Sequence, residues 1–255
     1  MLCAVALAAA LTTLPPCVSH AEPVQAVSAQ GTELVVSLPD ERVLRSADLV
    51  GAVLEVDDAG TPRTIRIDAV EREPGTGLWL HTLSMRSESG AFEPFCEPDA
   101  DGRRLAFPLA GRSLRDGRLV ADATRFELVC TSGAQGKCVR FGYAPWRSLD
   151  TYNACVRMVR ADYCGDGEAT TRDGTVIDIY DAVGVQKSEG GEDLTFEAGW
   201  SAEGAVCVAH PRIAENVTLP ALEARCPRLR GLTGAACTQA AARERGARLF
   251  NRSRP

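Results

Sequence analysis

Apolar and polar residues alternate in many short runs along this chain. The alternation is clearest in residues 34–38, 50–56, 64–70 and 78–83, with turn-forming residues such as Pro74-Gly75 between the runs. A two-residue period rich in β-branched side chains is typical of strands that bury one face. The pattern predicts antiparallel strands there and in the similar segments 104–109, 126–130, 139–143, 176–180, 194–200 and 205–210.

Helical spacing is clearest after Pro145. Ser148 can cap a helix, Gly165 can end it, and apolar residues recur every three or four positions between them: Leu149, Tyr152, Val156, Val159 and Tyr163. A second helix is expected over residues 234–249, which are rich in Ala and Arg. The predicted fold class is α+β, mainly β, with antiparallel strands, one central helix and a C-terminal helix, stabilised by disulfides.

The first residues resemble a targeting segment. Residues 4–11 are an apolar run too short to span a membrane, and Ser19 and Ala21 place small residues where a signal peptidase cleaves. We therefore predict a signal peptide over residues 1–21 and a mature chain that starts at Glu22. The alternative is a buried strand or helix.

A lipid anchor on Cys17 is a further alternative for this segment. Pro16 argues against it, because lipoprotein signals have a small residue directly before the cysteine. After cleavage, residues 22–30 are expected to form a flexible leader and residues 31–255 a single globular domain, with no transmembrane segment in the mature chain. The predicted location is the periplasm or the medium.

Removal of the signal peptide leaves eight cysteines: Cys96, Cys130, Cys138, Cys155, Cys164, Cys207, Cys226 and Cys237. An even number in an exported chain predicts up to four disulfides. Cys155 and Cys164 lie about 13 Å apart along a continuous helix, too far to pair. Cys130 and Cys138 flank a glycine-containing reversal between two predicted strands, which favours a local disulfide between them.

Charge is distributed unevenly along the chain. The formal net charge is −6, yet residues 224–255 carry eight Arg and only Glu244 as an acid. We interpret this tail as a solvated helix face that complements the acidic body, and a surface for nucleic acid or an anionic envelope polymer is the alternative. Lysine occurs only at Lys137 and Lys187. An excess of Arg and Ala over Lys more often reflects genomic base composition than selection for phosphate binding, so we expect no nucleic-acid partner. An envelope polymer or another exported protein remains open as the partner.

Several motifs together resemble a known family. They are Lys137-Cys138-Val139-Arg140-Phe141-Gly142-Tyr143-Ala144-Pro145-Trp146, the stretch Cys155 to Gly167, which contains Ala161-Asp162-Tyr163-Cys164, then Glu197-Ala198-Gly199-Trp200, Cys226-Pro227 and Leu249-Phe250-Asn251-Arg252-Ser253. On these residues the chain resembles the bacterial ADYC domain family over about residues 65–253. The resemblance implies a secreted or envelope-associated protein, and it supplies no catalytic residues.

The densest polar cluster follows the central helix. It consists of Asp162, Asp166, Glu168, Asp173, Asp178 and Asp181, interspersed with glycines. Oxygen ligands on a flexible loop suit calcium, and Asp162, Asp166, Asp173 and Asp178 are the candidate ligands. The spacing is not that of an EF-hand. The structural alternative is that Asp166 and Asp173 shape turns while Asp162 pairs with Arg157 or Arg160.

Aromatic residues gather at the entrance of the same helix: Tyr143, Trp146, Tyr152 and Tyr163. With Arg157 and Arg160 nearby, Tyr143 and Trp146 are candidates for a ligand-stacking face, and core packing is the alternative explanation.

Catalytic motifs are absent: no phosphate-binding glycine loop, nucleophile elbow or zinc-protease helix occurs. Two histidines follow the predicted cleavage site, His81 and His210, and a Cys/His hydrolase would need a free thiolate beside one of them. The sequence favours an exported, disulfide-bonded binding or structural module without a resident cofactor. An extracellular hydrolase and a calcium-stabilised ligand-binding domain are the alternatives.

Overall fold

The computed structural model describes residues 23–58 and 60–255. The predicted signal peptide, its cleavage point and Cys17 lie outside the described residues. The architecture is mainly antiparallel β-sheet with four short α-helices and four disulfides in the described part of the chain. This confirms the predicted fold class.

The first large sheet has six strands in the order β11-β8-β6-β5-β4, and β7 pairs with β6. The strands are β4 (Val53–Asp58), β5 (Thr61–Arg72), β6 (Trp79–Arg86), β7 (Phe92–Pro94), β8 (Leu105–Ala110) and β11 (Phe126–Cys130). Alternate residues such as Ile65 and Ile67 are fully buried, as the two-residue period predicts. Between β8 and β11, β9 (Arg112–Ser113) pairs with β10 (Leu119–Val120).

A small sheet precedes it, formed by β1 (Ala26–Gln30), β2 (Glu33–Ser37) and β3 (Val43–Arg45), with the short 3-10 helix η1 (Ser46–Leu49) after it. Its buried side chains Leu34 and Val36 share a core with Ile65, Ile67 and Leu83. The expectation of a flexible leader over residues 22–30 is therefore wrong for Ala26–Gln30. Those residues pair with β2 because a tight turn at Gly31 folds the chain back on itself.

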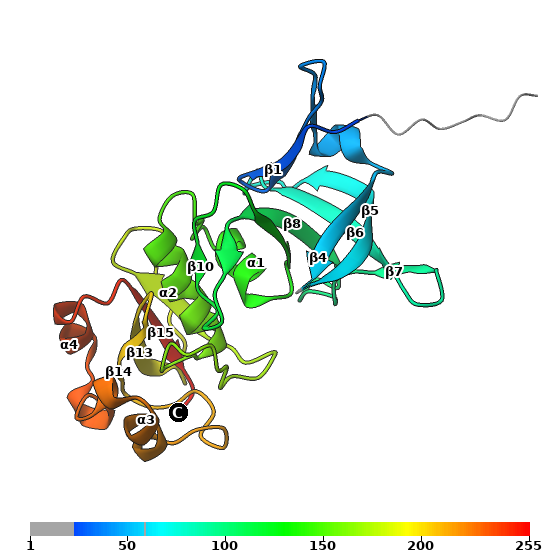
Figure 1. The fold of residues 1–255 in the computed structure, drawn as a ribbon. Coiled ribbons are helices and arrows are strands. Elements are labelled where there is room, and N and C mark those ends of the chain that lie inside the picture. The colour runs from blue at the N-terminus through cyan, green and yellow to red at the C-terminus, as the bar shows by residue number, and fades with distance from the viewer. Residues whose placement is uncertain (1–22, 59) are drawn as a thin grey trace, which may run out of the picture.

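The second large sheet has the order β12-β15-β13-β14, formed by β12 (Asp178–Asp181), β13 (Thr195–Ser201), β14 (Gly204–Val208) and β15 (Leu249–Ser253). The helices are α1 (Ala134–Arg140), α2 (Leu149–Arg160), α3 (Leu219–Arg225) and α4 (Gln239–Glu244), with 3-10 turns η2 (Pro227–Leu229) and η3 (Gly234–Ala236). In Figure 1 the two large sheets lie toward opposite ends of the molecule, with α1 and α2 between them.

One apolar core joins these parts. It runs from Leu80 and Phe107 of the first sheet, past Tyr152 and Met158 of α2, to Trp200 of the second sheet. The helix α2 begins as predicted, because the Ser148 side chain accepts a hydrogen bond from the Thr151 N–H. Helix α2 therefore links the two sheets.

Two predicted elements are wrong. Residues 139–143 were expected to form a strand, but α1 covers Ala134–Arg140. A Cβ on Gly136 would lie 2.2 Å from the carbonyl oxygen of Cys130, so glycine lets α1 pack directly against the end of β11. The helix expected over residues 234–249 is only the six-residue α4, and its last predicted residue, Leu249, begins strand β15.

The eight cysteines that follow residue 22 form four disulfides, as predicted: Cys96–Cys130, Cys138–Cys155, Cys164–Cys226 and Cys207–Cys237. The predicted Cys130–Cys138 bond is wrong. Because α1 rather than a hairpin occupies the intervening residues, Cys138 faces α2 and Cys130 faces the loop after β7. The inference that Cys155 and Cys164 bond to different elements is confirmed.

Candidate functional site

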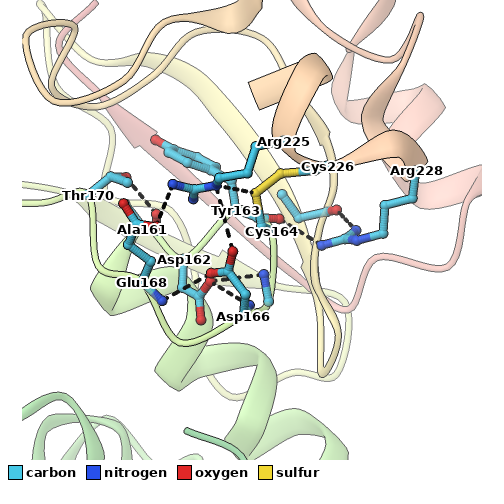
Figure 2. The surroundings of a disulfide bond; sticks show 12 residues. Ala161, Asp162, Tyr163, Cys164, Asp166, Glu168, Thr170, Arg225, Cys226 and Arg228 are labelled. Carbon is cyan, nitrogen blue, oxygen red and sulfur yellow. Dashed lines mark hydrogen bonds and ion pairs between the residues drawn. A yellow bond between two sulfur atoms is a disulfide. The ribbon is translucent and has the colours of Figure 1, made fainter. Parts of the chain in front are cut away.

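Buried hydrogen bonds, ion pairs and a disulfide meet at the segment that ends α2 (Figure 2). The helix stops at Ala161, which adopts a left-handed conformation with φ of 49°, four residues before the stop expected at Gly165. Thr170 fixes this turn by donating its hydroxyl hydrogen to the carbonyl oxygen of Ala161 at 2.7 Å. The chain is thereby turned back across the end of α2.

Asp162 organises the loop that follows. Its side chain is fully buried, and its carboxylate accepts hydrogen bonds from the backbone N–H groups of Gly165, Asp166 and Gly167 at 2.9 to 3.2 Å. It also forms an ion pair with the buried guanidinium of Arg157. A buried carboxylate is stable when its charge and its lone pairs are satisfied in this way.

Tyr163 connects this loop to a second buried ion pair. Its hydroxyl donates to Glu197 at 2.9 Å, and Glu197 pairs with Arg212 at 3.0 Å. Arg212 also donates to the carbonyl oxygens of Met158 and Val159 at the end of α2. Burial, followed by the charge of Glu197, raises the pKa of Tyr163 well above its ordinary value, so the phenol stays neutral. The sequence analysis missed this pair, although a Glu among the apolar residues of a strand was a signal for it.

Cys164 completes the loop through its disulfide to Cys226 at the end of α3. The guanidinium of Arg225 lies beside this bond, with Nε 3.0 Å from the sulfur of Cys164. Arg225 also pairs with Glu168 at 2.8 Å and with Asp166 at 3.6 Å. Figure 2 shows the guanidinium between the sulfur and the two carboxylates.

A cleft of about 390 Å³ lies elsewhere, between the β5–β6 turn and the C-terminal end of α1. Its lining residues are Glu73, Pro74, Thr76, Lys137, Arg140 and Phe141. Burial alone would raise the pKa of Glu73, but hydrogen bonds from Thr76, Arg140 and Arg103 hold it below its ordinary value. The wall therefore carries a carboxylate whose charge is stabilised by its hydrogen-bond partners.

Lys137 is the exception in this cleft. Arg140 is paired with Glu73 at 2.8 Å and with Asp99 at 3.4 Å. No hydrogen bond or ion pair of the Lys137 ammonium group occurs within residues 23–58 and 60–255. The cleft is thus lined by one cation without a described partner and by the aromatic residue Phe141. The sequence analysis missed this site because its two walls are more than sixty residues apart in the chain.

Comparison with family models shows the family of the chain. The model of the ADYC domain matches residues 46–214, about two thirds of the chain. The chain belongs to the ADYC domain family. No curated protein and no solved structure matches it. The four residues that spell the family name each hold a structural position in this ADYC domain: a helix end, a buried carboxylate, a buried phenol and a disulfide.

The predicted calcium ligands do not share one site in this ADYC domain. Asp162 is enclosed by Arg157 and backbone N–H groups, whereas Asp178 accepts from Ser188 and Glu189 and pairs with Arg252. In the part of the chain that the structure describes, no group of three or more His, Cys, Asp or Glu side chains could hold a metal ion. Calcium stays an untested prediction.

The other acidic residues of that cluster also serve the backbone. Asp166 accepts from the N–H of Glu168, and Asp181 accepts from the backbone of residues 183–186 and from the Tyr143 hydroxyl. Burial alone would raise the pKa of Asp181, but these bonds hold it below its ordinary value. The contacts of Asp162 and Asp166 match the structural alternative, whereas the Asp173 side chain makes no hydrogen bond or ion pair among the described residues.

The predicted ligand face is divided between core and surface. Tyr143 and Arg157 are buried, Arg160 donates to the carbonyl oxygen of Gly167, and Trp146 is 48% exposed beside Gly31. Tyr152 and Tyr163 belong to the core. The structure therefore brings no aromatic face together from these residues.

Among the described residues no free thiol accompanies His81 or His210, since the eight described cysteines are paired in disulfides. His81 lies 2.8 Å from the Ser46 hydroxyl, a contact that sequence reasoning missed, but both residues are buried. His210 contacts Thr195 at 2.9 Å. In the described residues, no helix is long and apolar enough to cross a membrane.

Proposed function

We propose that this ADYC domain is an exported binding module that holds a small anionic ligand in the cleft between the β5–β6 turn and α1. The observation that carries the proposal is Lys137, whose ammonium group has no partner among the described residues and borders the cleft. A cation at the rim attracts a carboxylate or phosphate group, and the Phe141 ring offers an apolar contact for the rest of the ligand.

Export is supported by the cysteines. Eight paired cysteines in an ADYC domain fit an oxidising compartment, where disulfides form and persist. The protein isolated from the periplasm or medium should start at Glu22 and weigh about 8 Da less than its reduced form, because each disulfide removes two hydrogens. Intact mass spectrometry before and after reduction measures both properties. A chain that retains residues 1–21 would contradict export by cleavage.

Binding is tested with benzoate, a carboxylate with an apolar ring. We expect benzoate to shift the backbone amide resonances of Thr76, Lys137 and Phe141 of the isotope-labelled protein. Lys137→Gln should weaken this binding about tenfold, since it removes a charge-assisted hydrogen bond. The matched control is Lys187→Gln, which removes the only other lysine.

Two results would contradict the proposal. One is that neither benzoate nor inorganic phosphate shifts the resonances of the cleft residues. The other is that Lys137→Gln and Lys187→Gln bind benzoate with equal affinity. Adding calcium in a separate titration tests the acidic residues after α2 independently, because their resonances differ from those of the cleft.

A further inference from the structure

The four disulfides differ in their surroundings. Both cysteines are buried in Cys138–Cys155 and in Cys207–Cys237. In each of the other two disulfides one cysteine is partly exposed: Cys130 in its bond to Cys96, and Cys164 in its bond to Cys226. Access by a reducing thiol therefore separates the disulfides into two pairs. An attacking thiolate reaches only sulfurs near the surface.

Charge separates the two accessible bonds from each other. Arg225 Nε lies 3.0 Å from the Cys164 sulfur. No cationic side chain makes such a contact with the sulfurs of Cys96 or Cys130 among the described residues. Thiol–disulfide exchange passes through a transition state in which three sulfur atoms share one negative charge. A guanidinium beside the central sulfur stabilises that charge and attracts the incoming thiolate.

The carboxylates that share Arg225 reduce this effect only in part. The side chains of Asp166 and Glu168 are 44% and 62% exposed, so water screens their charges. Nε of Arg225 lies 3.0 Å from the Cys164 sulfur and 3.6 Å from the Asp166 carboxylate, whereas the closest carboxylate contact, to Glu168, uses Nη1.

We propose that Cys164–Cys226 is a site of thiol–disulfide exchange, which a dithiol reduces while the other three disulfides stay intact. One thiolate of the dithiol attacks the Cys164 sulfur, the Cys164–Cys226 bond breaks, and Cys226 leaves with the electron pair. The second thiol of the reductant then attacks the mixed disulfide and releases Cys164. The dithiol loses two electrons and two protons, which the two cysteines gain.

Reduction would remove the covalent link between α3 and the loop after α2, while the ion pairs of Arg225 with Glu168 and Asp166 remain possible. The disulfide closes a segment with a sequence separation of 62 residues, the longest of the four. Asp162 still binds Arg157 and the loop backbone, and Arg228 still donates to the Tyr163 carbonyl oxygen at 2.7 Å. The reduced protein therefore keeps the hydrogen bonds that hold the end of α2.

The test is a timed reduction of the folded protein with dithiothreitol, trapped by alkylation and read by peptide mapping. We expect label on Cys164 and Cys226 before any other cysteine, with Cys96–Cys130 as the internal comparison. Arg225→Gln should slow this first step about three- to tenfold, because thiolate stabilisation speeds the exchange. Arg230→Gln, which removes an exposed charge from the same segment, should leave the rate unchanged, and Arg225→Lys should retain most of it.

A further variant keeps the test valid should Arg225→Gln unfold. Glu168→Gln leaves the guanidinium less compensated and should speed the first step. The proposal would be overturned if all cysteines were labelled at the same time or if another pair were labelled first. Equal reduction rates in Arg225→Gln and Arg230→Gln would also overturn it. An unchanged or slower rate in Glu168→Gln would do the same.

Discussion

Single buried side chains, rather than surface charges, hold the loop after α2. The Asp162 carboxylate satisfies three backbone N–H groups and the charge of Arg157 in one fully buried position. Removing one partner from such a site leaves the other charged and unpaired, and this is the costliest change available to a buried ion pair.

Asp162→Asn should therefore destabilise the protein by about 2 to 3 kcal/mol, because Arg157 keeps its charge in a buried site with only the longer ion pair to Asp116, at 3.6 Å, left to compensate it. Urea denaturation with the disulfides intact measures the free energy of unfolding. The control is Asp173→Asn, at an exposed position of the same acidic region. A double variant, Asp162→Asn with Arg157→Met, should recover part of the loss. Equal destabilisation by the two single Asp variants would contradict this account.

His81 makes stability depend on pH. Burial lowers its pKa below the ordinary value, although the hydrogen bond to Ala106 opposes the shift. The carbonyl oxygen of Ala106 can only accept, so Nδ1 carries the proton, and Nε2 accepts from the Ser46 hydroxyl. The unfolded chain takes up a proton below about pH 6.5, while the folded protein does so only at lower pH. Stability from this group is present above that value and is lost as the pH falls toward the folded pKa.

The free energy of unfolding should fall between pH 7.5 and 5.5, by at most about 1.4 kcal/mol from this group, as measured by urea denaturation at both values. Glutamine does not titrate, so in His81→Gln the difference in unfolding free energy between pH 7.5 and pH 5.5 should shrink. His210→Gln, the change at the other described histidine, should leave the difference as in the parent protein. The same pH difference in His81→Gln as in the parent would refute the assignment.

At the scale of elements, close contact between α4 and β13 depends on one glycine. A Cβ on Gly199 would lie 2.6 Å from the Cβ of Ala242 in α4 and 2.9 Å from that of Ala247. These are short side chains that cannot rotate away. The six-residue α4 therefore packs on the sheet only because Gly199 has no side chain.

Gly199→Ala should cost about 1 to 3 kcal/mol of unfolding free energy, because the added methyl group overpacks this contact. The double variant Gly199→Ala with Ala242→Gly should lose less unfolding free energy than the sum of the losses in the two single variants. Thermal and urea unfolding of the four proteins in this cycle give the coupling. Strict additivity would show that α4 adjusts its position freely.

Element type was predictable where a periodic pattern stood alone. The strands near residues 64–70 and 78–83, and the start of α2 after Ser148, follow from side-chain alternation and a capping residue. Residues 139–143 alternate too, but Val139 and Cys138 are buried by tertiary contacts of α1, which local pattern does not encode. The incorrect Cys130–Cys138 pairing follows from the same error. The cleft beside Lys137 could not be predicted, since its walls lie more than sixty residues apart. Glu197 stands out as an acid in an apolar strand, but its partner Arg212 lies outside that strand and could not be read from local pattern.

At the scale of the whole molecule, the family match is shorter than the folded unit. The match ends at residue 214, but strand β15 (Leu249–Ser253) lies between β12 and β13 in the second large sheet. Asn251 in β15 accepts from Trp200 at 2.8 Å and donates to Glu197 at 2.6 Å. A strand in the interior of a sheet supplies hydrogen bonds to two neighbours, so its loss leaves both unpaired.

A chain that ends at residue 214 should consequently fail to form the second sheet, although it contains the whole matched segment. It loses β15, and Cys164 and Cys207 lose their disulfide partners. We expect two free thiols, aggregation, and loss of cooperative unfolding in circular dichroism and thiol titration. A chain that ends at residue 253, after β15, should instead fold like the full protein and oxidise all eight cysteines. If the shorter chain folded cooperatively, the central place of β15 in the second sheet would not be needed for stability, and the matched segment alone would be the folding unit.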